Sequence, residues 1–435
     1  TVDILPEDAE IWQRIEAVVR EAAVIYNYYE IRTPYFEETG LFARSIGEDT
    51  DIVGKEMYTF RDKGERSLTL RPEGTASVAR AFIEHALDQR GLPQKLWYAG
   101  PMFRQERPQK GRQRQFHQFG IEAIGSSSPL MDAEVMIFFD DIMERLAIKD
   151  RIFLVNSVGG AESRALYKDA LGAFLSTAGD GLCEDCHRRK TSNPLRVLDC
   201  KVPGCREIIH ESEALPRTVD YLTGADRNHY EQLKNFLSAR RVRFREDHTL
   251  VRGLDYYTGP VFEMQYEGIG AQSAVMGGGR YDNLLRELGG GDFPAVGFAC
   301  GVERLILAME SAGAAVSVSP AGTVYVIASH GDLRQRALDY LYRLRSLGCP
   351  AEMDYLDRSM KAQMKSAARM NARYVLIVEP ETDAVTVRDM KKSDQSTVRF
   401  DQFLENNLGI FDTEIHDRAI NASQKDNSGA IEANQ

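Results

Sequence analysis

The sequence lacks both a long hydrophobic run and an excess of basic residues. No apolar stretch approaches the roughly 20 residues that a membrane-spanning helix needs, and the N-terminal segment has no secretory pattern. We therefore expect no membrane partner and a cytoplasmic location. The net charge is −11, so a nucleic acid would have to be bound through local basic surfaces and not through the charge of the whole molecule.

The length of the chain and the changes in its pattern of apolar and polar residues predict several domains. At 435 residues the chain is too long for one core. We predict the first part of a core in residues 1–159, an insertion with helical spacing and polar loops in 160–245, and the second part of the core in 246–318. Residues 319–409 alternate strands and helices as a separate α/β unit, and the polar residues 410–435 are expected to be disordered.

The most informative stretch is residues 98–125 (YAGPMFRQERPQKGRQRQFHQFGIEAIG). Its ends alternate apolar and polar residues, as the two strands of an antiparallel hairpin do. The loop between them is basic and has almost no apolar residue. Like charges repel across such a tip, so the tip is suited to binding phosphate groups. Arginine binds phosphate with its planar, forked guanidinium group. A solvated basic hairpin is the alternative.

The return strand of this hairpin has an unusual face. Phe116, Gln118, Gly120 and Glu122 occupy alternate positions and therefore point to the same side. An aromatic ring, an amide and a carboxylate on one side are odd for a core, which makes this face a candidate binding surface.

Residues 71–75 (RPEGT) follow a predicted strand and begin a predicted helix. A carboxylate and a hydroxyl at such a corner, from Glu73 and Thr75, can hold an ammonium group. Capping of the helix by the same two groups is the alternative.

Three later stretches also combine charge with glycine. Residues 251–266 are predicted to form a strand that contains Arg252 near its start. This residue must find an anion or water because it is always charged. Residues 277–282 (GGGRYD) are predicted to form a glycine turn, which lets the backbone approach a ligand or is simply a loop. Arg304 begins a helix after a glycine break, and a helix N-terminus favours anions.

These segments, in this order, resemble the class II aminoacyl-tRNA synthetases. The helix and strand that end at Pro34 resemble the first motif of that class, residues 103–116 the second, and residues 301–304 (GVER) the third. The stretches RPEGT, KGRQRQFHQFG and LVRGLDYYTG are similar to the histidyl-tRNA synthetase family in particular. The resemblance covers residues 3 to about 405.

The resemblance implies an α+β fold. This is a mixed, mostly antiparallel sheet flanked by helices, with a helical insertion and a C-terminal α/β anticodon-binding domain. It implies an enzyme that activates L-histidine with ATP, releasing pyrophosphate, and then transfers histidine to the 3′ end of tRNA(His). It also implies Mg²⁺ on the phosphates and a homodimer.

The resemblance also implies roles for individual residues. The catalytic cations at the α-phosphate would be Arg104 and Arg252. Histidine would be bound by Glu73, Gly74, Thr75, Gln118, Glu122, Arg252, Tyr256 and Tyr257, with Glu122 and Tyr257 at the two imidazole nitrogens. ATP would be bound by Arg104, Glu106, Arg112, Phe116 and Arg304, with Phe116 and Arg304 on the two sides of adenine. The tRNA would be bound by Arg107, Gln109, Lys110 and Arg114, and its anticodon read by basic positions such as Lys361, Lys365 and Arg369.

Four of the six cysteines lie in the predicted insertion. The spacing of Cys183, Cys186, Cys200 and Cys205 is compatible with a tetrahedral Zn²⁺ site, although the second pair is wider than the usual knuckle. Four reduced thiols in a cytosolic chain favour a metal over disulfides. Relatives are not expected to need a metal there, so a site without zinc is the alternative.

Two other functions are weighed against the ligase. A non-catalytic, histidine-binding regulatory paralogue of histidine biosynthesis typically lacks the anticodon domain and the arginines at the ATP site, and both are present here. A general RNA-binding module leaves unexplained why Glu73, Gln118, Glu122 and Tyr257 would gather in one pocket.

Overall fold

The structure is a computed structural model that describes residues 1–47, 50, 52–107, 109, 111–177, 181–210, 212–252, 256–314, 323–380, 383–392 and 394–407. The chain forms two compact units, Thr1–Ala315 and Val316–Gln435. The predicted tail at 410–435 and the predicted boundary near 318 lie outside the described residues. No helix in the described ranges is long and apolar enough to cross a membrane.

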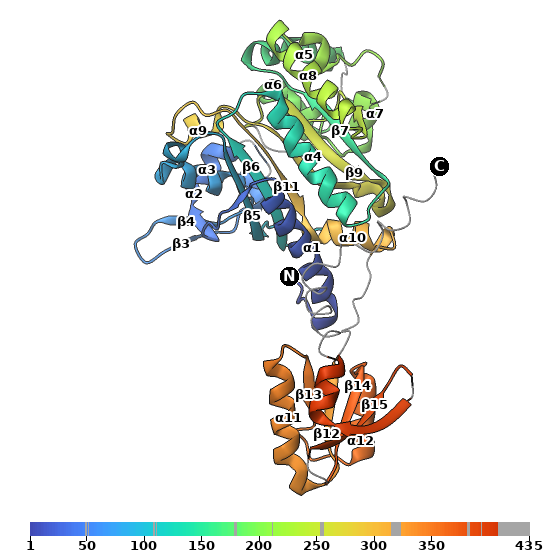
Figure 1. The fold of residues 1–435 in the computed structure, drawn as a ribbon. Coiled ribbons are helices and arrows are strands. Elements are labelled where there is room, and N and C mark those ends of the chain that lie inside the picture. Colours follow the sequence, from blue (N-terminus) through green and yellow to red (C-terminus); the bar gives the residue numbers. More distant parts are fainter. Residues whose placement is uncertain are drawn as a thin grey trace, which may run out of the picture. The chain divides into compact units, whose positions relative to one another are not determined.

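The first unit is built on a sheet whose strand order is β1-β5-β6-β11-β10-β9-β7-β8 (Figure 1). These strands are β1 (Tyr29–Glu30), β5 (Gln94–Phe103), β6 (Gln115–Ile124), β7 (Arg151–Ser157), β8 (Phe244–Glu246), β9 (Pro260–Tyr266), β10 (Ala274–Arg280) and β11 (Ala295–Gly301). The pairs β1–β5 and β7–β8, at the two edges, are parallel. The other pairs are antiparallel, which confirms the predicted mixed, mostly antiparallel sheet.

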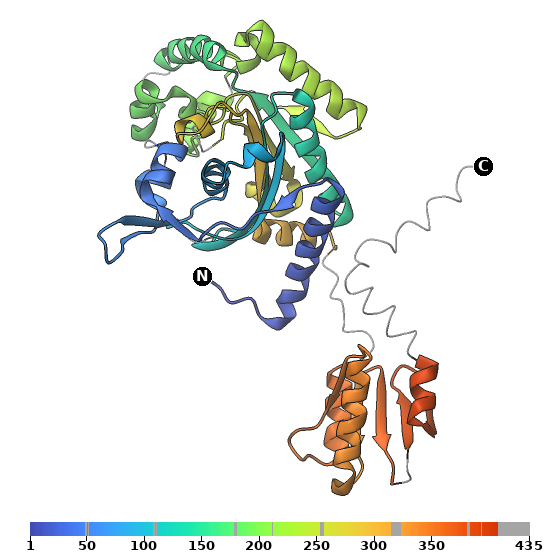
Figure 2. The same ribbon diagram turned by 60° about the vertical axis from the view of Figure 1, so that its left-hand side comes forward.

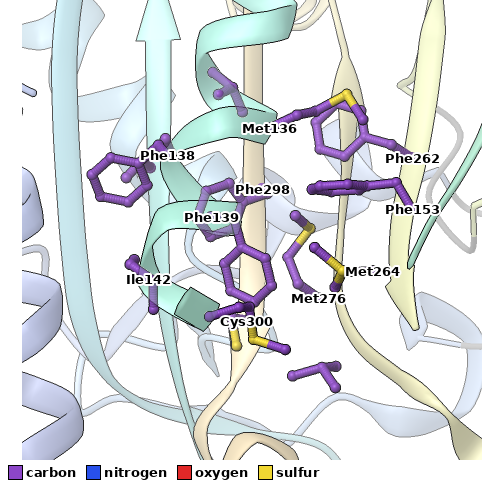
Figure 3. Close-up of a cluster of buried hydrophobic side chains, with 14 of the residues drawn as sticks. Met136, Phe138, Phe139, Ile142, Phe153, Phe262, Met264, Met276, Phe298 and Cys300 are labelled. Atoms are coloured by element: carbon purple, nitrogen blue, oxygen red, sulfur yellow. The ribbon is translucent and has the colours of Figure 1, made fainter. Parts of the chain in front are cut away.

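Helices pack on one face of this sheet to form its main hydrophobic core. They are α1 (Pro6–Ile25), α4 (Pro129–Arg145), α8 (Gly224–Ala239) and α10 (Val302–Ser311). Ser128 caps α4 by accepting a hydrogen bond from the amide of Leu130, and Pro129 supplies the fixed φ of a first helical position. Figure 3 shows Phe138 and Phe139 of this helix among sheet residues such as Phe298.

The opposite face of the sheet receives α3 (Thr75–Glu84), around which the sheet curves (Figure 2). Side chains alternate along a strand, so Phe119 and Ile121 of β6 enter the main core while Gln118 and Glu122 point to the side of α3. The face predicted from the alternation in residues 116–122 is therefore present, and it belongs to the site and not to the main core.

Smaller elements complete this unit. A second sheet joins β2 (Phe36–Glu38), β4 (Ser67–Leu70) and β3 (Thr59–Arg61), with β3 and β4 paired antiparallel. Between β7 and β8 in the sequence, the chain is helical, as predicted for the insertion. Its helices before α8 are α5 (Ala161–Thr177), α6 (Glu184–Ser192), η4 (Pro194–Val197), α7 (Pro203–His210) and η5 (Thr218–Tyr221). The remaining short helices are α2 (Thr39–Ile46), η1 (Ile52–Glu56), η2 (Leu87–Arg90), η6 (Glu267–Gln272) and α9 (Leu284–Glu287).

Two local predictions were wrong. The glycines of GGGRYD do not form a turn, because Gly277–Gly279 lie inside β10 with β9 and β11 on either side. The space that a Cβ would need is taken by other side chains: at residue 277 it would lie 1.8 Å from Nη2 of Arg252, and at residue 279 it would lie 2.7 Å from the ring of Tyr257. The strand predicted over 251–266 begins only at Pro260.

The second unit contains a five-stranded sheet of order β13-β12-β14-β15-β16. These strands are β12 (Val324–Ala328), β13 (Ala351–Met353), β14 (Tyr374–Val378), β15 (Ala384–Asp389) and β16 (Asp394–Arg399). Its two faces are covered by α11 (Arg334–Ser346), with a short η7 (Gly331–Leu333) before it, and by α12 (Met360–Arg369). The predicted α/β unit is confirmed. The edge strand β16 was not predicted, because its mostly exposed sequence DQSTVR has little apolar alternation.

Candidate active site

One cavity of about 730 Å³ in the first unit brings together residues that are far apart in the sequence. Of the residues predicted for the site, those that line it are Glu73, Thr75, Arg104, Glu106, Arg112, Phe116, Gln118, Arg252, Tyr256, Tyr257 and Arg304. The two arginines predicted to meet at one phosphorus atom, Arg104 and Arg252, therefore share a cavity.

Glu73 lines the cavity and also caps α3. Its carboxylate oxygens accept hydrogen bonds from the amides of Thr75 (2.6 Å) and Ala76 (2.9 Å). The capping alternative raised for this corner is thus real, but each oxygen keeps a second lone pair for a ligand. Burial raises the pKa of the Glu73 carboxyl.

Gly74 does not line the cavity, although it was predicted to contact histidine. A Cβ on this residue would lie 2.3 Å from the ring of Tyr98. Gly74 therefore serves the close approach of Tyr98 to the start of α3.

Gln118 supplies the cavity with a hydrogen-bond acceptor. Its side-chain oxygen Oε1 is buried, lines the cavity with the rest of the residue, and has no hydrogen-bond partner among the described residues. A buried acceptor left unpaired costs about 1–3 kcal/mol, so this atom is suited to a ligand that brings an N–H group.

Glu122 lies one layer behind the cavity wall. Its Oε1 accepts from Oγ1 of Thr75 (2.7 Å), and its Oε2 accepts from the hydroxyl of Tyr281. Burial raises the pKa of Glu122 to about 8, although the hydrogen bonds from Tyr281 and Thr75 oppose this shift. Burial therefore favours the protonated form of the Glu122 carboxyl.

Tyr281 was missed in the sequence, and a usable signal was present. Read as a strand, GGGRY places residue 281 in phase with residues 277 and 279. Arg252 and Tyr257 pack against those two glycines, and Tyr281 lines the same cavity. This alignment was not recognised because GGGRYD was predicted to form a turn.

Arg104 and Arg252 are held by fixed contacts. Nε of Arg104 donates to the backbone oxygen of Pro72 (3.0 Å), and its guanidinium lies 5.2 Å from the centre of the Phe116 ring. Nη1 of Arg252 lies 2.5 Å from Oε2 of Glu263. Glu263 was not predicted, and only its polar character within the apolar strand β9 hinted at a role.

The remaining cavity arginines are also anchored. Nη1 of Arg304 donates to the backbone oxygen of Ala274 (2.7 Å), and Nη1 of Arg112 pairs with Glu106 (3.3 Å). These contacts aim two more cations at the cavity from α10 and from the hairpin loop.

The residues predicted to bind tRNA are separate from this cavity. Arg107, Gln109 and Arg114 are exposed on the loop between β5 and β6 and do not line it. Lys110 lies outside the described residues. Mutual backbone hydrogen bonds between Gln109 and Arg112 shape the tip, which joins the cavity wall through Arg112.

Comparison with known proteins gives a consistent result. The family model described as histidyl-tRNA synthetase matches residues 1–305, and the model described as anticodon binding domain matches residues 323–407. A curated histidine–tRNA ligase of Halothermothrix orenii is 48% identical over 408 residues, which cover 93% of this chain and 97% of the relative. One from Thermosipho melanesiensis is 48% identical over 404 residues, covering 92% and 95%.

A solved structure has the same fold over nearly its whole length. The apo histidyl-tRNA synthetase of S. aureus is 38% identical, with a TM-score of 0.79, and the match covers 94% of this chain and 98% of that one. With the sheet, the cavity and the two matched family models in agreement, the chain belongs to the histidyl-tRNA synthetase family.

Proposed function

We propose that the chain is a histidine–tRNA ligase that uses ATP to activate L-histidine and then esterifies tRNA(His). One observation carries this proposal: a single cavity is lined both by the buried acceptors of Glu73 and Gln118 and by the guanidinium groups of Arg104 and Arg252. That combination suits an amino acid whose ammonium group is held while its carboxylate meets a phosphate. Similarity over nearly the whole length to curated histidine–tRNA ligases supports the catalytic function over the regulatory alternative.

Histidine would be recognised by complementary hydrogen bonds. Glu73, Thr75 and Gln118 would accept from its α-amino group. The hydroxyl of Tyr257 would bind the imidazole, and Glu122, behind the cavity wall, would act on it through the hydroxyls of Thr75 and Tyr281. Neutral imidazole offers one donor and one acceptor. An apolar amino acid would leave these groups unpaired, and a pocket of this kind rejects such analogues by roughly 10⁴ or more. The buried rings of Tyr256 and Tyr257, 4.8 Å apart, would form the pocket wall.

In the first step the histidine carboxylate attacks the α-phosphate and pyrophosphate leaves. Negative charge develops on the phosphoryl oxygens, so fixed cations stabilise the transition state more than the ground state. Arg104, anchored on Pro72, and Arg252, anchored on Glu263, supply such cations. Phe116 and Arg304 would hold adenine by stacking and cation–π contact, and Arg112 would meet the outer phosphates.

Mg²⁺ fits the carboxylates of this cavity. Glu106, Glu263 and Glu303 line it, and carboxylate oxygens together with substrate phosphates are the ligands that Mg²⁺ prefers. When bound, the ion would neutralise charge on the phosphates. Glu106 and Glu263 also hold Arg112 and Arg252 in place.

In the second step the 3′ hydroxyl of tRNA attacks the adenylate carbonyl and AMP leaves. We assign the hydroxyl proton to a phosphate oxygen of the adenylate, which the substrate itself brings to the reacting hydroxyl. The exposed tip with Arg107 and Arg114 would grip the acceptor stem. Lys361, Lys365 and Arg369 are exposed along α12, and would contact the anticodon region.

The homodimer and the cytoplasmic location are part of the same proposal. Val24, Ile25 and Tyr29, at the end of α1 and on the edge strand β1, are more than half exposed. Such an apolar edge suits contact with a second copy. All six cysteines are free thiols, which fits a reducing compartment. Sedimentation of the purified chain tests the dimer directly.

The activity test is histidine-dependent exchange between ATP and pyrophosphate, followed by charging of tRNA(His). A ligase shows both, and other amino acids do not replace histidine. A regulatory paralogue would bind histidine without exchange, and an RNA-binding module would show neither histidine binding nor exchange. Either result would overturn the proposal.

A further inference from the structure

Four cysteines from three short segments of the insertion meet at one point. Their sulfur atoms all lie within 4.8 Å of one another, and Sγ of Cys183 is 3.8 Å from Sγ of Cys200. Three of the four residues are buried, and Cys183 is half-buried. The other two cysteines of the chain, Cys300 and Cys349, are not part of this group.

We propose that Cys183, Cys186, Cys200 and Cys205 bind one Zn²⁺ ion in a closed, structural tetrathiolate site. A zinc–sulfur bond is about 2.3 Å long, so the sulfur atoms of a regular tetrahedron lie about 3.8 Å apart. The 3.8 Å separation of Cys183 and Cys200 matches this value. A disulfide would need sulfur atoms about 2.05 Å apart.

The backbone around the group favours thiolates. Cys183 is the N-cap residue of α6, Cys186 lies in the first turn of that helix, and Cys205 lies in the first turn of α7. The positive ends of two helix dipoles therefore face the sulfur atoms. In addition, the amide of Cys183 donates to Sγ of Cys205 (3.1 Å), the kind of outer hydrogen bond that orients metal ligands.

The helices around the four cysteines are short. The helices α6 and α7 have nine and eight residues, and η4 has four. Helices this short are not stable alone, and the hydrophobic cluster that joins them is small and includes Cys186, Cys200 and Cys205 themselves. Zinc would supply the stability that the small cluster lacks.

The site would also shape the wall of the active-site cavity. Cys200 lines that cavity, together with its neighbours Asp199 and Lys201. An ion on Cys200 would therefore hold this loop in place from behind. With four protein ligands the ion has no open position, so it would have no part in the chemistry. The inference does not rest on the proposed function.

The test is the metal content of the full chain, purified under reducing conditions and without a metal-binding tag. We expect about one zinc per chain by elemental analysis. Cys186→Ser and Cys205→Ser should reduce this to near zero, whereas the control Cys349→Ser, in the second unit, should keep one. Cobalt exchanged into the parent protein should show the absorption of a tetrahedral thiolate site.

Several results would overturn the proposal without any substrate being present. They are a parent protein without zinc after growth in zinc-supplemented medium, iron in place of zinc, zinc retained in both cysteine variants, or disulfides among the four residues in freshly purified protein. Because the parent protein alone supplies the metal count and the cobalt spectrum, the test does not depend on folding of the variants. Absence of exchange activity in a zinc-loaded chain would count against the ligase and leave the zinc site standing.

Discussion

The guanidinium group of Arg252 lies against the bare backbone of Gly277, so closely that a Cβ on residue 277 would be 1.8 Å from Nη2. Gly277→Ala should therefore push Arg252 aside without breaking the sheet, since the obstructed atom is the end of a flexible side chain. A misplacement of about 1 Å can cost roughly 10²-fold in rate. We expect the exchange rate to fall by about that factor with little change in melting temperature.

The matched control for this substitution is Gly172→Ala. Gly172 lies in α5 with open space where its Cβ would be, so alanine there should leave exchange unchanged. Normal exchange in Gly277→Ala would mean that the position of Arg252 does not matter to the reaction.

Arg252→Ala tests the transition-state role of the guanidinium directly. Loss of one such group costs about 10²–10³ in rate, so exchange should be crippled while the dissociation constant for histidine, measured by calorimetry, changes little. Arg286→Ala, at an exposed arginine paired with Asp292, is the control. An equal loss of histidine binding and exchange would refute the role given to Arg252.

Much of this arrangement could be predicted from the sequence. Apolar periodicity located the hairpin at 98–125 and most of the second unit, because burial on one face leaves a regular pattern. The wrong prediction at GGGRYD has a physical origin. Glycine usually marks a turn. Here glycines suit a central strand because Arg252 and Tyr257, from another segment, pack where their Cβ atoms would be.

Long-range pairs could not be predicted in the same way. Nothing local to Glu263 or Tyr281 shows that they face Arg252 and Glu122. The position of Glu122 behind the cavity wall also depends on how α3 seats against β6. Resemblance to a family supplied the candidate residues. Which of them line the cavity and which lie behind its wall became clear only from the fold.

Gln118→Met should separate binding from stability. The substitution keeps the shape of the side chain and removes a buried acceptor that has no partner in the described part of the chain. The melting temperature should stay the same or rise, while affinity for histidine should fall by about tenfold or more. Thermal unfolding and calorimetric titration measure the two effects. A lower melting temperature with unchanged affinity would make Gln118 a structural residue.

Glu122→Gln should change how stability depends on pH. Glu122 has a pKa of about 8 in the folded chain and an ordinary value near 4.5 when unfolded, so the unfolded chain releases its proton first as the pH rises. Stability from this group is therefore lost between about pH 4.5 and pH 8, at up to about 1.4 kcal/mol for each pH unit. The glutamine variant has no such loss.

The measurement is urea unfolding of parent and variant at pH 5.5, 7 and 8.5. The stability of Glu122→Gln relative to the parent should increase with pH, and its affinity for histidine should be weaker at pH 7. A difference in stability that stays constant with pH would show that Glu122 has an ordinary pKa in the fold.

Arg107 and Arg114, exposed on the tip between β5 and β6, should matter to the second step alone. Changing both to glutamine removes two cations that would contact phosphates, so charging of tRNA(His) should slow and its dependence on salt should become shallower by up to about two in slope. Histidine-dependent exchange, which needs no tRNA, should stay at the parent level. Arg44→Gln, at an exposed arginine on α2, is the control and should alter neither step. An equal fall in exchange and charging would mean that the two arginines act in the ATP-dependent first step. The tip would then have no role in binding RNA.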